Sequence, residues 1–229
     1  MIINMLNIFK RKQNPLPKKT WKDITLAAHQ RILEVYDKYR FEEDDSMMVY
    51  DLVTAVYGWE PHKIDGMTIT EANRYVETIT FLGEKPKPIA AKGSYTLNGK
   101  KYKTTMNLSK VTTAQYIDFQ QMADKSGELP AEFLSIILVP EGKQYNEGYD
   151  LEEAVNDIKY GLSVEEALGL TAFFFDLLRI SMKRSTALLK RLIKRAKKEG
   201  KMTEEQLSDL KRVQSLLTEC AGGMKPLTL

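Results

Sequence analysis

Residues 163–198, SVEEALGLTAFFFDLLRISMKRSTALLKRLIKRAKK, begin the clearest structural unit of this chain. Ser163 and Glu166 have the spacing of a capping box, in which two side chains satisfy backbone amides at the start of a helix. Behind them, apolar residues recur at the spacing of one helical face. These residues are Leu178, Met182, Leu189, Ile193 and Ala196. The stretch therefore predicts one long helix that continues to about Lys198.

A second helix is predicted after a short connection that contains Gly200. Residues 203–223 begin with Thr203 and Gln206 at capping-box spacing, and Gly222 is typical of the position just after a helix end. Its apolar seam consists of Leu207, Leu210, Val213 and Leu217. Because so few residues join the two helices, we expect them to form an antiparallel helical hairpin.

Capping signals and helical spacing predict further helices upstream. The expected ranges are 20–40, 47–58, 68–82, 112–123, 130–139 and 150–161. Asp45 or Ser46 is expected to cap the second of these helices, and Gly58 is expected to end it. Pro140 stops the fifth, because proline cannot continue a helix.

Residues 93–109, GSYTLNGKKYKTTMNLS, predict a β-hairpin. Asn98 and Gly99 suit a type I′ turn, in which both central residues have positive φ. Alternation places four residues on one half-buried face, namely Tyr95, Leu97, Tyr102 and Thr104. A lone hairpin is only marginally stable in water. It is therefore either a flap packed on the domain or an edge offered to a partner.

These signals predict a mainly α protein: a multi-helix domain with one small β-hairpin and a long C-terminal antiparallel helical hairpin. Two prolines and two glycines in residues 83–93 mark the best internal boundary. The expected segments are an apolar and basic arm at 1–19, a helical part at 20–82, the linker and β-hairpin at 83–110, a central helical part at 111–162, and the long basic helix with its helical hairpin at 163–229.

The composition is that of an ordinary globular protein, with 43% apolar and 28% charged residues and a net charge of +3. A single cysteine, Cys220, excludes an intrachain disulfide and fits a reducing compartment. The most apolar stretch, 170–180, is too short to span a bilayer. In residues 1–19 the apolar residues precede the positive ones, the wrong order for a secretory signal. We therefore expect no membrane span and assembly or action in the cytoplasm.

Catalytic motifs are missing from the sequence. It has no GxxxxGK[ST], no GxGxxG after a strand and no GxSxG. His29 and His62 stand outside any HExxH or Cys/His cluster, which argues against a zinc site. We therefore expect a protein that is not an enzyme and has no cofactor or metal. Chemistry based on carboxylates alone remains open.

Two acidic stretches are candidates for binding a hard cation. Residues 42–45 are consecutive acids that fan out around the backbone, which favours a solvated, capping surface over a calcium loop. Residues 138–150 read LVPEGKQYNEGYD, and their acids are Glu141, Glu147 and Asp150. These acids lack the alternating spacing of a calcium loop, and the last fits a helix cap. The loop is therefore predicted to be a connector shaped by packing.

Three surfaces are candidates for binding a macromolecule. The arm carries Ile2, Ile3, Leu6 and Phe9. It is a frayed terminus, a docking segment for a neighbouring subunit, or an amphipathic membrane anchor. The tip of the β-hairpin carries Asn98, Gly99, Lys100 and Lys101. In an assembly, the edge of this hairpin would form hydrogen bonds with a neighbouring subunit.

The third surface is the basic run on the long helix. It includes Lys183, Arg184, Lys190, Arg191, Lys194, Arg195 and Lys198. Such a run is a solvated face, a site for an acidic protein partner, or a site for the phosphates of a nucleic acid. No aromatic residues are interleaved for base stacking, and acidic residues lie on the following helix.

Residues 107–176 combine TTAQYIDFQ, LSIILVPEGKQYNEGYD and LSVEEALGLTAFFF in that order. This order resembles small proteins encoded among the tail and virion genes of tailed phages and prophages of Bacteroidetes-type hosts. In those proteins a helix with a Thr/Ala–Gln–Tyr/Phe–Ile–Asp pattern precedes a helix that ends in a Pro–x–Gly–x–x–Tyr loop. The resemblance covers about residues 70–200. It implies a tail-assembly chaperone-like protein or a minor virion component, and no enzyme.

We therefore expect a non-enzymatic protein of phage tail or virion assembly. It would bind other phage structural or tail proteins, form a homo-oligomer within an assembly, and occur in the host cytoplasm during assembly or in the virion. The first alternative is a nucleic-acid-contacting virion protein that uses residues 179–201. The second is an enzyme that works with carboxylates alone.

Overall fold

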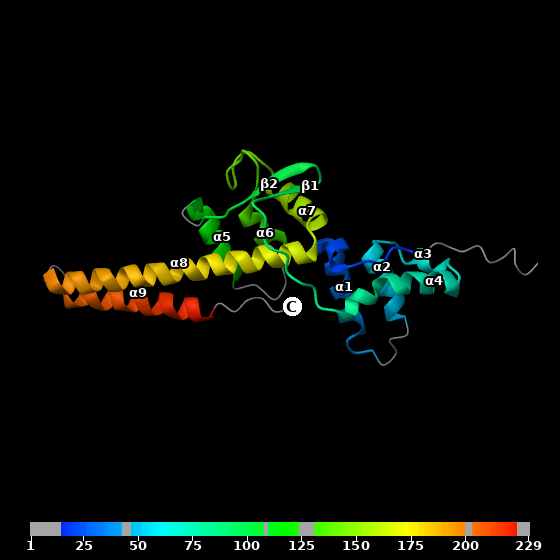
Figure 1. Cartoon of the computed structure of the whole chain (residues 1–229), viewed down its shortest axis with the longest axis horizontal. Coiled ribbons are helices and arrows are strands. Elements are labelled where there is room, and N and C mark those ends of the chain that lie inside the picture. Colours follow the sequence, from blue (N-terminus) through cyan, green and yellow to red (C-terminus); the bar gives the residue numbers. More distant parts are fainter. Residues whose placement is uncertain (1–14, 43–46, 108–109, 124–130, 200–202, 224–229) are drawn as a thin grey trace, which may run out of the picture. The chain divides into compact units, whose positions relative to one another are not determined.

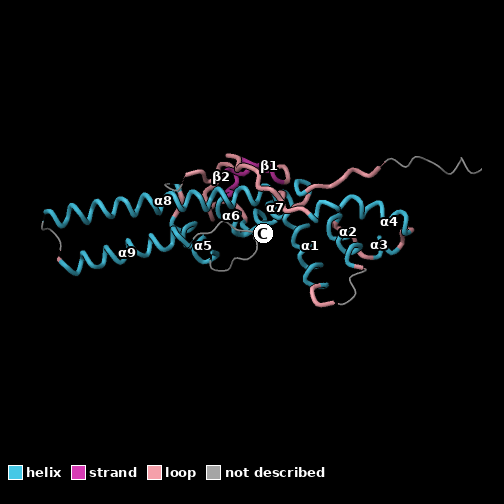
Figure 2. The backbone as a smooth tube through the Cα atoms, turned by 60° about the horizontal axis from the view of Figure 1, so that its bottom comes forward, coloured by secondary structure: helices cyan, strands magenta, loops and turns pink. Residues whose placement is uncertain are grey.

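The computed structural model describes residues 15–42, 47–107, 110–123, 131–199 and 203–223. Helices dominate these residues, which confirms the mainly α class (Figures 1 and 2). The chain divides into two compact units, residues 1–86 and 87–229. The division falls within the stretch 83–93, where prolines and glycines interrupt the helical pattern.

The first unit consists of short helices. They are the 3-10 helix η1 (Trp21–Asp23), α1 (Leu26–Tyr39), α2 (Met48–Tyr57), α3 (His62–Asp65), α4 (Ile69–Val76) and the 3-10 helix η2 (Glu77–Gly83). Ile24, Ile32 and Val53 are fully buried between them. Arg31 joins α1 to α2, because its Nε donates to the carbonyl oxygen of Ala55 at 3.0 Å. This unit is stabilised mainly by its small apolar core.

The helix predicted over residues 20–40 is divided. Asp23 accepts a hydrogen bond from the Thr20 amide at 2.8 Å and so stabilises only the short turn η1. Ile24 then takes an extended conformation, and the Thr25 hydroxyl caps α1 by accepting from the Ala28 amide at 3.3 Å. Two caps within six residues therefore compete, and the second begins the long helix.

The predicted end of α2 is confirmed. Gly58 has φ 65°, in the left-handed region that glycine adopts at low cost. The predicted caps Asp45 and Ser46 lie outside the described residues. At the start of α4, Thr68 and Glu71 form the predicted capping box: the Glu71 carboxylate accepts from the Thr68 amide at 3.0 Å.

The second unit contains the predicted β-hairpin, formed by β1 (Ser94–Leu97) and β2 (Lys100–Thr104). Its two turn residues, Asn98 and Gly99, have φ of 47° and 78°, as a type I′ turn requires. The four residues predicted to share a face, Tyr95, Leu97, Tyr102 and Thr104, are all buried. The hairpin therefore packs on the domain along that face.

The β structure is larger than the sequence predicts, because β3 (Leu138–Pro140) pairs antiparallel with β2 in the order β1-β2-β3. The predicted helix over residues 130–139 ends early, as α6 (Ala131–Ile137). Leu138 pairs with Thr104, which gives the free edge of β2 a partner. Pro140 has no amide hydrogen and is tolerated on such an edge strand.

The remaining helices of this unit are α5 (Thr113–Ala123), α7 (Leu151–Gly161), α8 (Val164–Glu199) and α9 (Glu204–Gly223). Three predicted caps are confirmed by hydroxyl oxygens that accept amide hydrogen bonds. The pairs are Thr112 with Gln115 at 3.2 Å, Ser163 with Glu166 at 3.3 Å, and Thr203 with Gln206 at 3.3 Å. The predicted stop at Gly222 is wrong, because α9 continues through Gly223.

α8 changes its surroundings halfway along its length. Its first half belongs to the core, where Leu170 is fully buried and Phe174 packs edge to face on Phe119. Its second half packs along α9, and the two helices form the predicted antiparallel hairpin (Figure 1). The predicted seam on α9 is wrong at Val213, which is 46% exposed, whereas Leu210 is half-buried. The side chains of Leu207 and Leu217 lie outside the described residues.

Candidate interaction surfaces

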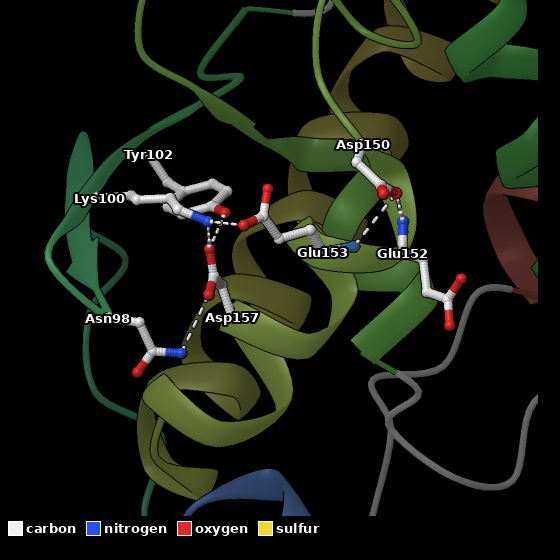
Figure 3. A network of polar contacts seen from close by, with 7 residues as sticks. All are labelled: Asn98, Lys100, Tyr102, Asp150, Glu152, Glu153 and Asp157. Atoms are coloured by element: carbon white, nitrogen blue, oxygen red, sulfur yellow. Dashed lines mark hydrogen bonds and ion pairs between the residues drawn. The ribbon is translucent and has the colours of Figure 1, made fainter.

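A buried carboxylate ties the β-hairpin to α7 (Figure 3). Asp157 is 6% exposed and accepts three hydrogen bonds: from Asn98 Nδ2 at 3.0 Å, Lys100 Nζ at 2.9 Å and the Tyr102 hydroxyl at 2.7 Å. Glu153, one turn earlier on α7, pairs with the same Lys100 ammonium at 2.6 Å. These five residues are called the Asp157 network below. They fix the hairpin on the helix.

Electrostatics hold the Asp157 network in one protonation state. Burial raises the pKa of Asp157, but hydrogen bonds from Tyr102, Asn98 and Lys100 and the lysine charge outweigh it, so the pKa lies below its usual value. Burial and the bond to this carboxylate raise the pKa of the Tyr102 phenol. At neutral pH the carboxylate is ionised and the phenol is protonated. A carboxylate so held is a poor general base, so the network is a structural anchor.

Sequence reasoning missed Asp157, although one signal was available. It follows Ala154 by three residues and precedes Ile158, both of which are buried. An acid at that spacing lies on the apolar stripe of α7. A buried carboxylate is stable only with partners, and the lysine and asparagine of a nearby hairpin turn are natural ones.

The hairpin tip is engaged within the chain. Asn98 and Lys100 belong to the Asp157 network, and Lys101 Nζ lies 3.2 Å from Glu141. Gly99 lies at the turn itself and is exposed. The hairpin is thus packed on the domain, and binding of a partner at its tip stays a prediction.

The loop 138–150 is anchored to α5 and β2 by contacts within the chain. The Tyr145 hydroxyl donates to Asp118 at 2.8 Å, and Glu141 pairs with Lys101 and with Lys103 at 3.0 Å. Asp150 caps α7 as predicted, by accepting from the Glu152 amide at 2.9 Å. Within the described residues, no three acidic, histidine or cysteine side chains are placed to share a metal ion.

Replacing Asp150 by Ala is expected to lower the free energy of unfolding by about 1 kcal/mol, the usual effect of losing an N-cap. The Asp150 carboxylate accepts from two backbone amides at the start of α7, and without it both amides would hydrogen-bond only to water. Chemical denaturation monitored by circular dichroism measures the change. Asp150→Ser is the control, and a serine variant as unstable as the alanine variant would contradict the capping role.

Two surface clefts of about 570 and 370 Å³ lie in the second unit. The larger lies beside β2 and the loop, and its charged lining residues are Lys103, Lys110 and Lys143. The smaller lies between α5 and α8, with Phe119 and Phe174 in its wall. Neither of these two clefts is lined by Asp, Glu, His or Cys. They therefore offer no support for an enzyme that works with carboxylates.

All seven basic residues singled out on the long helix are exposed on the second half of α8. Lys183, Lys190 and Lys194 lie on one side of the helix, seven and four residues apart. Arg184, Arg191, Arg195 and Lys198 continue this surface around the side facing away from α9. This surface is called the cationic face below. It can bind an anionic partner of extended shape.

The other candidates fall in less informative places. The arm residues Ile2, Ile3, Leu6 and Phe9 and the acids 43–45 lie outside the described residues, as does the side chain of Cys220. His29 is half-buried, packs edge to face on Trp21, and has a pKa lowered by that burial. His62 is exposed.

Comparison with protein-family models, curated proteins and solved structures found no significant match. The resemblance to phage tail and virion proteins thus stays an expectation from short motifs. Within the described ranges, none of the helices has the length and apolar content that a membrane crossing requires.

Proposed function

We propose that this chain is a non-enzymatic assembly protein of a phage tail or virion. In this proposal the cationic face of α8 binds an acidic surface of another protein of the same particle. The observation that carries it is the exposure of all seven basic side chains over the second half of a 36-residue helix. The phage setting comes from the resemblance alone.

The charge pattern favours a protein partner. Basic residues on one face accelerate encounter with an acidic surface and fix its orientation. Residues 179–198 contain no aromatic side chain on which bases could stack. Duplex phosphates need only cations, so contact with DNA is the second candidate function.

The triple substitution of Lys183, Lys190 and Lys194 by Gln tests the proposal. A matched control replaces Lys18, Lys22 and Lys85 by Gln, which changes the net charge equally at exposed sites of the first unit. We expect the triple variant to lose capture of its virion or tail protein from a lysate of the producing cells. The control should capture it as the unaltered chain does.

Binding to duplex DNA decides between the two candidates. If the cationic face contacts DNA, the unaltered chain binds with a log–log salt slope of several units, and the triple variant loses that binding. Equal capture of the protein partner by both variants would contradict the proposal.

A further inference from the structure

Besides Ile180, four large apolar side chains are exposed among the described residues of the α8–α9 hairpin. They are Leu188 at 57%, Leu192 at 48%, Val213 at 46% and Leu216 at 52%. Single exposed apolar residues are ordinary, whereas a contiguous patch marks a binding surface. Their arrangement on the two helices therefore decides what they mean.

On α8 the exposed leucines lie beside the seam with α9. Leu189 is half-buried and Ile193 is buried in that seam, and Leu188 and Leu192 each precede one of them by one position. Successive residues of a helix are turned by about 100°. Both leucines therefore lie on the same side of the seam, four residues apart, as adjacent neighbours.

On α9 the pattern repeats. Gln214 is half-buried, and Val213 precedes it by one position. In an antiparallel helix pair, the residues one position before the seam residues of either helix lie on the same face of the pair. The short connection places Val213 and Leu216 level with about residues 187–190 of α8. The four side chains thus form one patch, called the apolar strip. Lys190 and Lys194 lie on the opposite side of the seam.

Charges near the connection of the hairpin identify the occupant. On the strip side of α8, Arg195 follows Leu192, and on the same side of α9 acidic residues lie at about the level of Arg195. Among the described side chains of α9, these exposed acids are Glu205 and Asp209. A second hairpin can be laid on the strip so that α8 of each copy lies over α9 of the other. The basic C-terminal end of each α8 then meets the acidic first turns of the other copy's α9. Laying α8 on α8 would place like charges together, which is unfavourable.

We infer that the apolar strip binds a second copy of this chain, so that two hairpins form an antiparallel four-helix bundle with α8 of each copy on α9 of the other. The strip of one copy covers that of the other, as two-fold symmetry requires. This association goes beyond the proposed function, because it leaves Lys190 and Lys194 on the outer side of the bundle.

The size of the hairpin limits the strength of this dimer. The 20 residues of α9 make a face about 30 Å long, and two adjacent helices make it about 20 Å wide. The interface then buries about 600 Å² per copy, near the lower end of stable interfaces. We expect a dimer that dissociates in the micromolar range.

Sedimentation equilibrium of the full chain under reducing conditions tests the inference. The unaltered chain should reach twice its 26.2 kDa as concentration rises through the micromolar range. The double variant Leu188→Gln/Leu192→Gln should raise the dissociation constant by at least about 100-fold, because four leucines leave the interface. The control Ile69→Gln/Ile180→Gln replaces two exposed apolar residues off the strip and should leave it unchanged.

A second substitution tests the arrangement of the two hairpins. Asp209→Lys should raise the dissociation constant about tenfold at low salt, and high salt should reduce the difference. Circular dichroism must show unchanged helix content in every variant. A chain that stays monomeric at high micromolar concentration, or a dimer unaffected by the double variant, would overturn the inference.

Discussion

Replacing Gly169 by Ala should destabilise the second unit by about 3 kcal/mol, the upper range for overpacking. The linker segment 87–92 runs against α8 at this point. A Cβ on Gly169 would overlap the carbonyl oxygen of Ile89 and lie 2.6 Å from its carbonyl carbon. Backbone cannot move aside as the end of a side chain can.

The segment cannot shift without losing its own contacts. The Ile89 amide donates to the carbonyl oxygen of Glu165 at 2.9 Å, and the Lys87 amide donates to the Glu165 carboxylate at 3.1 Å. Lys92 pairs with Glu166 one residue farther along α8 at 2.6 Å. An added methyl group therefore either separates the segment from α8 or bends the helix.

The sign of this effect distinguishes it from helix propensity. In an open helix, Gly→Ala stabilises by about 1 kcal/mol. Gly93→Ala is the control, because a Cβ there has no atom within 4 Å. Denaturant unfolding of both variants measures the difference. A Gly169→Ala variant as stable as the unaltered chain would contradict the close approach of linker and helix.

Replacing Asp157 by Ala should cost about 3 kcal/mol, because it leaves buried donors without an acceptor. Tyr102 is only 1% exposed and its hydroxyl loses its acceptor, and the side-chain amide of Asn98 also loses its acceptor. Lys100 is half-exposed and keeps Glu153 as a partner.

A double-mutant cycle with Tyr102→Phe isolates the central bond. We expect the double variant to be more stable than the sum of the two single changes predicts, by about 1–2 kcal/mol, because the hydroxyl that Asp157→Ala strands is then absent. Additive effects would show that the phenol and the carboxylate do not interact.

The pH dependence of stability gives an independent readout of the same carboxylate. Because the pKa of Asp157 is lowered in the folded chain, its contribution is present above the unfolded value of 3.8 and is lost as pH falls through the folded value. The unaltered chain should therefore lose more stability below about pH 4 than Asp157→Ala does. Equal acid sensitivity would mean that the carboxylate is not ionised in a favourable site.

Helix starts could be predicted from the sequence because their physics is local. Ser163 with Glu166 and Thr203 with Gln206 satisfy amides within four residues of themselves, so spacing alone reveals them. The type I′ turn at Asn98 is local in the same sense. Predictions for these elements hold whatever the rest of the chain does.

Features that depend on distant residues could not be predicted. Leu138–Pro140 continues an apolar helical run, and only the free edge of β2 makes it a strand. Gly169 has no local role that would reveal the linker passing over it. Val213 matches the helical spacing of a seam, yet the true seam passes beside it. In each case the deciding partner lies far along the chain.

Site-specific photo-cross-linking from position 190 of the full chain, in the cells that naturally produce it, identifies what the cationic face binds. A photoreactive residue in place of Lys190 keeps the other cations of the face and reports what lies against it. We expect a covalent adduct with an acidic tail or virion protein, lost when Lys183 and Lys194 are also replaced by Gln. An adduct with nucleic acid alone, or no adduct with any macromolecule, would show that the cationic face does not bind a protein partner.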